Sequence, residues 1–506
     1  MEDFDYIPGT EIKKFAFSKE DLLDCLPKGF YFHRKPYYHQ LLSVVFAMQF
    51  DNGVGLYLSM GTGKTQTAID ILRAKCIEDR ILVISVGASL YNWKEEFKIN
   101  AGNEYKVKVV SGSSKEKNQL LSERADVYII NYEGTFARKK LERDALGRKK
   151  RRRFVFEDMV LPNLNKSWNA IVLDESREIM SAQAYQTRIA MRLTMQSDFC
   201  IVMSGLPIVK FLGEIFTQQF CIDKGDQFST SYNRFIATYF RKELERGFPK
   251  LVPYGFAEPE IHKKMYQQGI RYVISECWDL PPKIHVTREL EIKGDAKSFY
   301  QDLKRKKAAM VITKKNKVEV NAILIRFMQI CGGWLKAGDE VMEFKNNVKL
   351  DELLYLLNGE LASDKVVIIA SFVAEQHGIY DFLEQQGITV LKIVSGMNPE
   401  EIFEAAKKFN EADKPIRLVM SPRVGGRAIN LKACYMIKFS QDFDKEANLQ
   451  AEDRIYGSGR GIEGVSSTYI RFIIKESVDE KVEQVLRDNA RLIDKVIEGK
   501  KIGDYI

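Results

Sequence analysis

A short glycine-containing turn between two apolar segments is the feature that most restricts how this chain can fold. The sequence at 59–68 is SMGTGKTQTA, preceded by the apolar run VGLYL and followed by a segment with helical spacing, TAIDILRAK. Gly61 and Gly63 let main-chain amides approach phosphate oxygens, and the helix that follows points its positive end at them. The sequence therefore predicts a phosphate-binding loop at a strand-to-helix turn.

The residues of this loop have distinct expected contacts. Lys64 can reach the β- and γ-phosphates of a nucleotide, and Thr65 offers its hydroxyl to Mg²⁺. The strict loop pattern has a glycine five positions before Gly63, where this chain has Leu58, so only the G-x-G-K-T core matches. The loop residues expected to contact the nucleotide are Gly61, Thr62, Gly63, Lys64, Thr65 and Gln66.

Composition favours a globular protein with a polyanionic partner. The 506 residues leave room for several domains, and the formal net charge is +8. The seven cysteines are odd in number and form no C-x-x-C pair, which predicts neither a disulfide framework nor a zinc site and fits a reducing cytoplasm. The acidic amino terminus lacks an apolar core, and no apolar run approaches the roughly 20 residues of a spanning helix, so we expect neither secretion nor membrane insertion.

Strands and helices alternate along both halves of the chain. Apolar runs at 81–86, 125–134 and 170–173 predict a parallel sheet with helices on its faces. From residue 209 to about 280 the spacing is helical and rich in aromatic residues. A second α/β unit begins near Leu350, with four expected strands in DKVVIIASF, ITVLKIVSG, IRLVMSPRVGGRAINL and ACYMIKFSQDFD.

A tyrosine-rich segment before the phosphate loop is a candidate for contact with a nucleotide base. RKPYYHQ at 34–40 opens a stretch with helical spacing. Gln40 is placed to read an adenine edge through its amide, and Tyr37 or Tyr38 could stack on the base. A surface helix with ordinary aromatic residues explains the same pattern equally well.

Two adjacent carboxylates end an apolar strand in WNAIVLDES. Asp174 would hold Mg²⁺, and Glu175 would act as the base for an attacking water. The next apolar strand, DFCIVM, is followed by SGLP at 204–207, a turn that could sense what the carboxylates hold.

Two segments are candidates for contact with nucleic-acid phosphates. The turn at 87–89 begins a helix, whose amino terminus could hold a phosphate, although the same residues also suit a plain strand-to-helix turn. The excursion at 137–164 carries six consecutive bases, which suit either a solvated hairpin tip or phosphate contacts. These bases are Arg148, Lys149, Lys150, Arg151, Arg152 and Arg153.

Arginines follow the last strands of the second unit. QAEDR at 450–454 is expected on a helix, and Arg460 lies shortly after it. Arginines at the edge of one domain are candidates for fingers that reach a γ-phosphate held by another. Surface pairing of Arg454 with its acidic neighbours, Glu452 and Asp453, is the alternative.

Together these blocks resemble the superfamily two helicases and translocases, and within them the Swi/Snf-type DNA translocases. The resemblance runs from about Arg34 to Val496, and the order and spacing of the blocks carry it. The most specific blocks are MGTGKT, ILVISVGASLYNWKEEF, NYE at 131–133, WNAIVLDES, SGLP, LIRFMQICGGW, SPRVGGRAINL, QAEDRIYGSGR and STYIRFIIKESVDEKVEQVL.

The resemblance implies an α/β fold of two tandem RecA-like domains with parallel sheets and helical insertions between them. The implied boundaries are an amino-terminal extension at 1–29, a first domain at 30–285, a helical linker at 286–344 and a second domain at 345–506. ATP would bind between the two domains, with Lys64, Asp174, Glu175, Arg454 and Arg460 as the catalytic set. Further implied contacts to ATP come from Gln40, Gly426 and Gln450, and to nucleic acid from Ser89, Asn131, Tyr132 and Ser421.

Three positions depart from the pattern that the family usually has. Arg177 stands where histidine is usual after the carboxylate pair, and Leu206 stands where threonine is usual. Gly457 occupies the place of a second arginine, so Arg460 is displaced from the usual finger position.

The function implied by the resemblance is a DNA-stimulated ATPase that tracks along DNA and remodels duplex, forked or branched DNA, largely without regard to sequence. Its cofactors would be ATP and Mg²⁺. A 3′-to-5′ strand-separating helicase, and an ATP-dependent clamp or protein-displacing module with slow hydrolysis, stay open as alternatives, as does RNA as a partner. A compact chain of this kind looks like the bacterial or viral members of the family, which places it in the cytoplasm.

Overall fold

The structure, a computed structural model, forms two compact units, Met1–Asp279 and Leu280–Ile506, each with its own sheet. All seven cysteines carry free thiols. Among the residues described, no helix combines the length and the apolar character that crossing a bilayer needs. The described residues are 17–136, 160–208, 211–245, 248–278, 281–307, 317–338, 340–424, 429–456 and 465–487.

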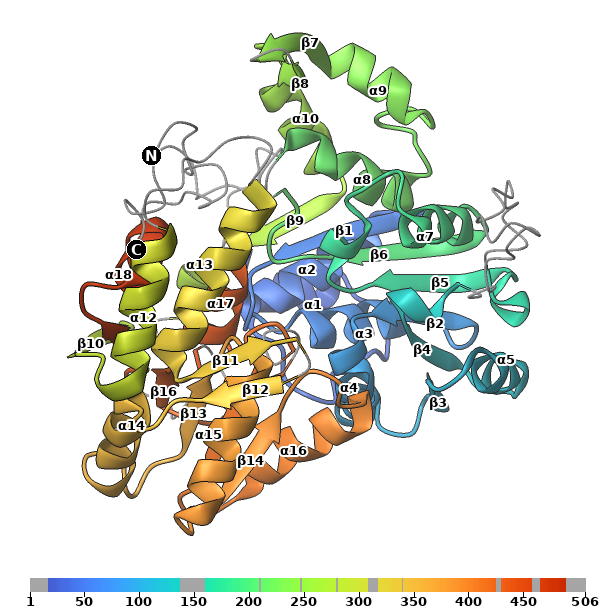
Figure 1. Ribbon diagram of the computed structural model, residues 1–506. Coiled ribbons are helices and arrows are strands. Elements are labelled where there is room, and N and C mark those ends of the chain that lie inside the picture. The colour runs from blue at the N-terminus through green and yellow to red at the C-terminus, as the bar shows by residue number, and fades with distance from the viewer. Residues whose placement is uncertain are drawn as a thin grey trace. The chain divides into compact units, whose positions relative to one another are not determined.

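Seven parallel strands form the sheet of the first unit, in the order β3-β4-β2-β5-β6-β1-β9 (Figure 1). Because all of them run the same way, their carboxyl ends meet at one edge, where α/β proteins bind their ligands. The strands are β1 Gly53–Leu58, β2 Ile81–Ser85, β3 Val107–Val110, β4 Val127–Asn131, β5 Trp168–Leu173, β6 Ser197–Met203 and β9 Gly269–Tyr272.

Helices cover both faces of this sheet. Side chains on a strand alternate between faces, and on β2 Leu82 and Ile84 enter one hydrophobic core while Ile81 and Val83 enter the other. The second core includes α2, α3 and α4, and the first includes α5, α7 and α8. The helices are α1 Lys19–Asp24, α2 Tyr38–Met48, α3 Lys64–Ala74, α4 Leu90–Ala101, α5 Ser114–Ser122, α7 Tyr185–Met195 and α8 Ile215–Asp223.

The segment from 209 to 280 is not uniformly helical, which corrects the sequence prediction. Helices α9 Tyr232–Tyr239 and α10 Ala257–Met265 flank an antiparallel hairpin of β7 Phe240–Glu245 and β8 Phe248–Pro253, and the four project from the sheet of the first unit (Figure 1). The segment ends with strand β9, which joins the sheet beside β1, and the short helix α11 Ile274–Cys277.

Six parallel strands form the sheet of the second unit, in the order β10-β17-β16-β13-β15-β14. Four of them match the strands that the apolar runs after Leu350 predict. The strands are β10 Ile284–Leu290, β13 Val366–Ile369, β14 Val390–Ile393, β15 Arg417–Met420, β16 Tyr435–Lys438 and β17 Thr468–Ile474.

The stretch expected as a helical linker, 286–344, contributes directly to the second unit. Strand β10 pairs along its whole length with β17, from Ile284 opposite Thr468 to Leu290 opposite Ile474. It is followed by a helical pair, α12 Gly294–Lys307 and α13 Lys317–Gly332, and by a hairpin of β11 Trp334–Ala337 and β12 Glu340–Glu343. The remaining helices are α14 Val348–Asn358, α15 Val373–Gln385, α16 Pro399–Glu411, α17 Lys445–Glu452 and α18 Val478–Arg487.

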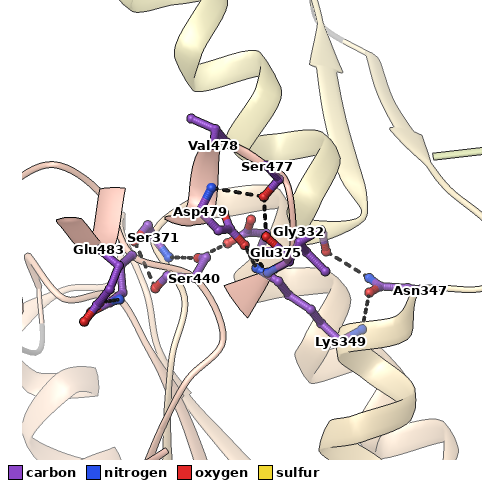
Figure 2. A network of polar contacts seen from close by, with 12 residues as sticks. Gly332, Asn347, Lys349, Ser371, Glu375, Ser440, Ser477, Val478, Asp479 and Glu483 are labelled. Atoms are coloured by element: carbon purple, nitrogen blue, oxygen red, sulfur yellow. Dashed lines mark hydrogen bonds and ion pairs between the residues drawn. The ribbon is translucent and has the colours of Figure 1, made fainter. Parts of the chain in front are cut away.

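A buried polar network joins element ends in the second unit (Figure 2). Lys349 near the start of α14 is fully buried, and its Nζ lies 2.7 Å from Asp479 Oδ2 at the start of α18. Glu375 in the first turn of α15 accepts a hydrogen bond from the hydroxyl of Ser440, which follows β16. The Ser371 amide donates to the same hydroxyl oxygen over 2.9 Å. These contacts join the start of α14 to the start of α18, and the start of α15 to the segment that follows β16.

Candidate nucleotide-binding site

The predicted phosphate loop connects β1 to α3 at the carboxyl edge of the first sheet. Gly61 and Gly63 have φ angles of 84° and 83°, in the left-handed region that glycine adopts without strain. Between them Thr62 is buried, and its hydroxyl donates to Ser59 O over 2.7 Å. Thr65 lies half-buried in the first turn of α3, where the helix amino terminus favours a negatively charged ligand.

Two neighbouring side chains of α2 hold the main chain of this loop. His39 Nε2 lies 2.8 Å from Thr62 O, and Gln40 Nε2 donates to the same oxygen over 3.1 Å. Because a carbonyl oxygen only accepts, His39 carries its proton on Nε2 here. Burial lowers the pKa of His39, which favours this neutral form.

Gln40 packs closely on the loop as well as bonding to it. Its Oε1 accepts the main-chain amide of Tyr37 over 2.9 Å, and a Cβ placed on Gly63 would lie 2.0 Å from its Nε2. Tyr37 is 42% exposed, with Trp278 edge-on to its ring at 4.0 Å. Tyr38 instead donates its hydroxyl to Phe17 O over 3.0 Å. Of the two tyrosines, Tyr37 is therefore the better placed to stack on a base.

The lysine of the loop is buried and folded over it. Lys64 Nζ donates to Leu58 O over 2.9 Å and lies 3.4 Å from Ser59 O. Gly205 of the SGLP turn approaches the loop, since a Cβ on it would lie 3.6 Å from the Met60 amide nitrogen. Gln66, expected to contact the nucleotide, is buried and donates to Arg34 O over 3.1 Å, so its side chain is already engaged within the protein.

Asp174 follows β5 and is enclosed by hydrogen-bond donors. Its Oδ2 accepts from the Ser85 hydroxyl over 2.7 Å and from the Trp93 indole over 2.9 Å. Its Oδ1 accepts the Glu175 amide over 2.9 Å, and its main-chain oxygen accepts the Tyr132 hydroxyl over 2.8 Å. Burial and the neighbouring Glu175 raise the pKa of Asp174, while the hydrogen bonds from Ser85 and Trp93 and the charge of Lys64 oppose that rise.

These residues suit a magnesium ion bound with a nucleotide. Mg²⁺ takes oxygen ligands and is held in such sites by few protein groups together with phosphates and waters. Asp174 Oδ1 has a single donor, so it keeps capacity for a cation, and Thr65 supplies a hydroxyl from α3. Glu175, at a left-handed φ of 48°, follows directly in the chain. The donor set therefore agrees with the predicted roles of Thr65 and Asp174.

The carboxylate pair is connected to the SGLP turn through one glutamine. The Ser176 hydroxyl donates to Gln218 Oε1 over 2.6 Å, and Gln218 Nε2 donates to Pro207 O over 2.6 Å. All of Gln218 is buried, on α8. Leu206, where the family usually has threonine, is 55% exposed. The turn thus contacts both the phosphate loop and the segment after Glu175.

Two residues expected to contact nucleic acid, Ser89 and Tyr132, have buried side chains. Ser89 is 1% exposed; its hydroxyl lies against that of Ser85 and donates to Val86 O over 2.8 Å. Tyr132 is 2% exposed and bonds to Asp174. Asn131 is partly exposed and donates to Glu133 over 2.9 Å. The basic run Arg148 to Arg153 lies outside the described residues.

The candidate residues of the second unit are mostly turned inward. Arg454 is 2% exposed; its Nε donates to Gln450 O over 3.1 Å and its Nη1 to Ile429 O over 3.3 Å. The alternative of surface pairing with Glu452 or Asp453 does not describe a guanidinium so deeply buried. Ser421, after β15, is 6% exposed. Gly426 and Arg460 lie outside the described residues.

Comparison with known families identifies the class of protein. The SNF2-related domain matches residues 39–332, more than half of the chain, and the helicase conserved C-terminal domain matches residues 348–459. The chain therefore belongs to the SNF2-related family. This confirms the predicted resemblance and the predicted α/β fold of two RecA-like domains, and it confirms the predicted enzyme class, ATP-dependent helicases and translocases, at the level of the family.

Individual relatives are distant and mostly longer. An "Uncharacterized ATP-dependent helicase" of Mycoplasma pneumoniae is 22% identical over 87% of this chain and 39% of its own length. The human "DNA annealing helicase and endonuclease ZRANB3" is 21% identical over 95% of this chain and 42% of its own. The SWI2/SNF2 ATPase core of Sulfolobus solfataricus, solved in complex with dsDNA, is 20% identical, covers 93% of this chain and 95% of that one, and has a TM-score of 0.42. The chain spans about two fifths of the length of the curated relatives it matches first.

Sequence reasoning missed several residues that shape this site. The sequence points to Gln40 rather than to its neighbour His39, and it gives Trp93 no role beyond its place in the block ILVISVGASLYNWKEEF. Gln218 lies on an apolar helix and carries no local signal, whereas Ser85 ends an apolar strand. The one available clue was a polar residue at the carboxyl end of a buried strand, which applies to Ser85.

Proposed function

We propose that the chain is a DNA-stimulated ATPase that moves along DNA and remodels duplex, forked or branched DNA. The observation that supports it best is the series of groups along one edge of the first sheet. In the order of the strands they are the turn after β4, the turn after β2, Asp174 after β5, the SGLP turn after β6 and the phosphate loop after β1. Candidate nucleic-acid contacts and candidate nucleotide contacts are therefore neighbours.

Lys64, Thr65, Asp174 and Glu175 would perform the hydrolytic part of this function. Lys64 Nζ would exchange the carbonyls of Leu58 and Ser59 for phosphate oxygens. Thr65 and Asp174 would hold Mg²⁺, which when bound would neutralise charge on the β- and γ-phosphates. Glu175 would orient and deprotonate the attacking water. Tyr37 would stack on the base, while Gln40 keeps the loop closed beneath it.

DNA is the proposed polymer for three reasons. The net charge of +8 favours a polyanion. The relative ZRANB3 is named as a DNA annealing helicase. The turn at 87–89 leads into α4, so its main-chain amides could bind phosphates without reading bases. Contacts of that kind suit movement along DNA of any sequence.

Arg454 is proposed to contact the γ-phosphate during turnover. Its guanidinium would first have to leave the carbonyl oxygens of Ile429 and Gln450. The other expected roles are proposed as well. Gly426 and Gln450 would contact ATP, and Arg460 would take part in catalysis. Ser421, Asn131 and the basic run Arg148 to Arg153 would contact nucleic acid.

The experiment that tests the function is ATP turnover measured without nucleic acid and with single-stranded DNA, duplex DNA, branched DNA or RNA. Duplex or branched DNA should raise kcat by about tenfold or more, which corresponds to about 1.4 kcal/mol in the barrier. Lys64→Ala and Glu175→Gln should abolish the stimulated turnover. Stimulation by single strands alone would favour a strand-separating helicase, and absence of any stimulation would favour a nucleic-acid clamp; either result contradicts the proposal.

A further inference from the structure

The side chains that enclose Asp174 lie within or next to the two turns proposed to contact nucleic acid. Trp93 lies on α4, which begins directly after the turn at 87–89. Tyr132 opens the 3₁₀ turn Tyr132–Gly134, directly after Asn131 at the end of β4. Both are almost fully buried, at 1% and 2% exposure. Each therefore connects a surface turn to one buried carboxylate residue.

Trp93 is rigidly linked to the first of these turns. It lies four positions, about one helical turn, after Ser89, so a shift of the main chain at 87–89 would move the indole with it. The indole N–H donates to Asp174 Oδ2 over 2.9 Å. A hydrogen bond to a charged acceptor in a buried site is stronger and more directional than one at the surface.

A second path leads from the same turn through two serines. Ser89 and Ser85 are buried with their hydroxyl oxygens in contact, and Ser85 donates to Asp174 Oδ2 over 2.7 Å. The Ser85 proton points to Asp174, and the single hydroxyl proton of Ser89 is shared between Ser85 and Val86 O, which lies 2.8 Å away. Gly87 and Ala88, which lie between the two serines, are partly exposed. The turn thus combines two partly exposed residues with one buried hydroxyl that contacts Ser85.

The Tyr132 hydroxyl completes the enclosure from a third direction. It donates over 2.8 Å to the main-chain oxygen of Asp174, while its neighbours Asn131 and Glu133 are partly or fully exposed. Oδ2 of Asp174 then has two donors, while Oδ1 faces a single main-chain amide. The enclosure fixes which carboxylate oxygen stays available to a metal ion.

We infer that Trp93, Ser85 and Tyr132 are positioning residues that transmit nucleic-acid binding at the turns 87–89 and 131–134 to Asp174. Polymer bound at these turns sets the orientation of the carboxylate and so the rate of ATP hydrolysis. The inference rests on the proposed function, which it extends by naming the connection between the polymer and the ATPase centre. All of its parts lie within the first unit.

A purely structural role for these donors makes a different prediction. A buried carboxylate needs hydrogen-bond donors whatever the protein does. If that were their only role, removing one donor would weaken folding or nucleotide binding. The factor by which DNA stimulates ATP hydrolysis would then stay the same. The ratio of DNA-stimulated to basal kcat separates the two roles, because a loss of active protein lowers both rates equally.

The test compares Trp93→Phe with Trp168→Phe, using full-length protein, ATP and duplex DNA. Phenylalanine keeps most of the ring packing and removes the N–H in each case. Trp168 is a matched control because it is buried in the same unit and its indole donates to Leu164 O over 3.2 Å, at the opposite end of β5 from Asp174. We expect Trp93→Phe to lower the stimulation ratio about tenfold, the factor of one charge-assisted hydrogen bond. Trp168→Phe should keep the wild-type ratio.

Ser85→Ala and Tyr132→Phe should lower the ratio in the same direction, with KM for ATP changing less than the stimulated kcat. A readout that does not depend on turnover is the fluorescence of Trp93, obtained by subtracting the Trp93→Phe spectrum from that of wild type. Adding duplex DNA without nucleotide should change this difference spectrum. The subtraction is practical because the chain has only four tryptophans.

The outcomes separate the inference from the proposed function. If duplex DNA does not stimulate the wild-type protein, the proposed function fails and the inference fails with it. If the wild-type protein is stimulated but Trp93→Phe keeps its ratio, or if DNA leaves the Trp93 spectrum unchanged, the inference is wrong while the function stands. A loss of stimulation in Trp168→Phe equal to that in Trp93→Phe would also overturn it.

Discussion

At the scale of single residues, the site depends on the main-chain conformation around Thr62. This residue lies between two glycines with left-handed φ angles, and its carbonyl oxygen accepts hydrogen bonds from both His39 and Gln40. The glycines permit the conformation and the two side chains select it. Together they hold the loop ready for phosphate, so that little ordering remains to be done when a nucleotide binds.

Gly63→Ala should weaken nucleotide binding by more than about tenfold, since a shift of Gln40 would break its bond to Thr62 and misplace the loop. The new Cβ would lie 2.0 Å from Gln40 Nε2. Gly387→Ala is the matched control: its φ is 72° and nothing lies within 4 Å of the added carbon, so only backbone strain is introduced. Titration with a fluorescent nucleotide measures both. Wild-type affinity in Gly63→Ala would contradict the role given to Gln40.

Glu375 should make the second unit less stable as pH rises. Burial raises its pKa from 4.5 to about 7 in the folded chain. Between these values the folded state binds more protons than the unfolded state, so the free energy of unfolding falls with increasing pH, by at most about 1.4 kcal/mol per pH unit. Glu375→Gln, which stays neutral, should flatten this dependence.

Hydrogen exchange of β13 and β16 at pH 5 to 8 measures the effect of Glu375, after correction for the intrinsic exchange rate. Glu404→Gln, at an exposed position on α16, serves as the control and should keep the wild-type slope. An unchanged slope in Glu375→Gln would show that another group controls the pH dependence. Lys349 and Asp479, which lie in the same network, are the charged groups to test next.

At the scale of elements, the sequence predicts the strands well and their partners less well. The apolar runs locate β1, β2, β4, β5 and β6, and their alternation with helices predicts the parallel sheet. The hairpin β7–β8 was missed because aromatic residues such as Phe235, Tyr239 and Phe240 repeat at a spacing that also suits a helix. The pairing of β10 with β17 joins segments about 180 residues apart, which no local pattern can show.

The same limit applies to the candidate site. The loop, the carboxylate pair and their chemistry follow from local sequence, because each is a compact motif. The buried hydroxyl of Tyr132 bonds to Asp174, which is distant in sequence and adjacent only after the sheet forms. The sequence therefore predicts Ser89 and Tyr132 at the correct edge of the sheet, but not the hydrogen bonds that their side chains make within the protein.

The ion pair between α14 and α18 should contribute substantially to the stability of the second unit. Lys349→Met would leave Asp479 largely buried without its cation, which costs about 3 kcal/mol in typical cases. The double variant Lys349→Met, Asp479→Asn should lose less than the single variant, because no unpaired charge remains. Lys307→Met, which breaks a surface pair with Glu319, should have little effect.

Urea unfolding followed by hydrogen exchange in α14 and α18 resolves the ion pair's contribution separately from the first unit. A single variant as stable as the wild-type chain would show that Asp479 finds another partner. The Ile474 amide already donates to Asp479 Oδ2 over 3.3 Å and would remain as a donor in the variant.

At the scale of the whole molecule, the proposed function is that the chain uses ATP hydrolysis to move along duplex DNA. Turnover assays measure ATP hydrolysis and binding assays measure affinity for DNA, but neither measures movement of the protein along DNA. Removal of the third strand of a triple helix measures this movement. The third strand lies in the path of a protein that moves along the duplex, and it can be removed without separating the duplex strands.

The most direct test is therefore displacement of a labelled third strand from duplex DNA, with ATP, by the wild-type chain and by Lys64→Ala. The account predicts time-dependent displacement that needs a free length of duplex beside the triplex, and none by Lys64→Ala or with a non-hydrolysable ATP analogue. Equal displacement by Lys64→Ala, or DNA-stimulated ATP hydrolysis by the wild-type chain that never removes the third strand, would contradict it.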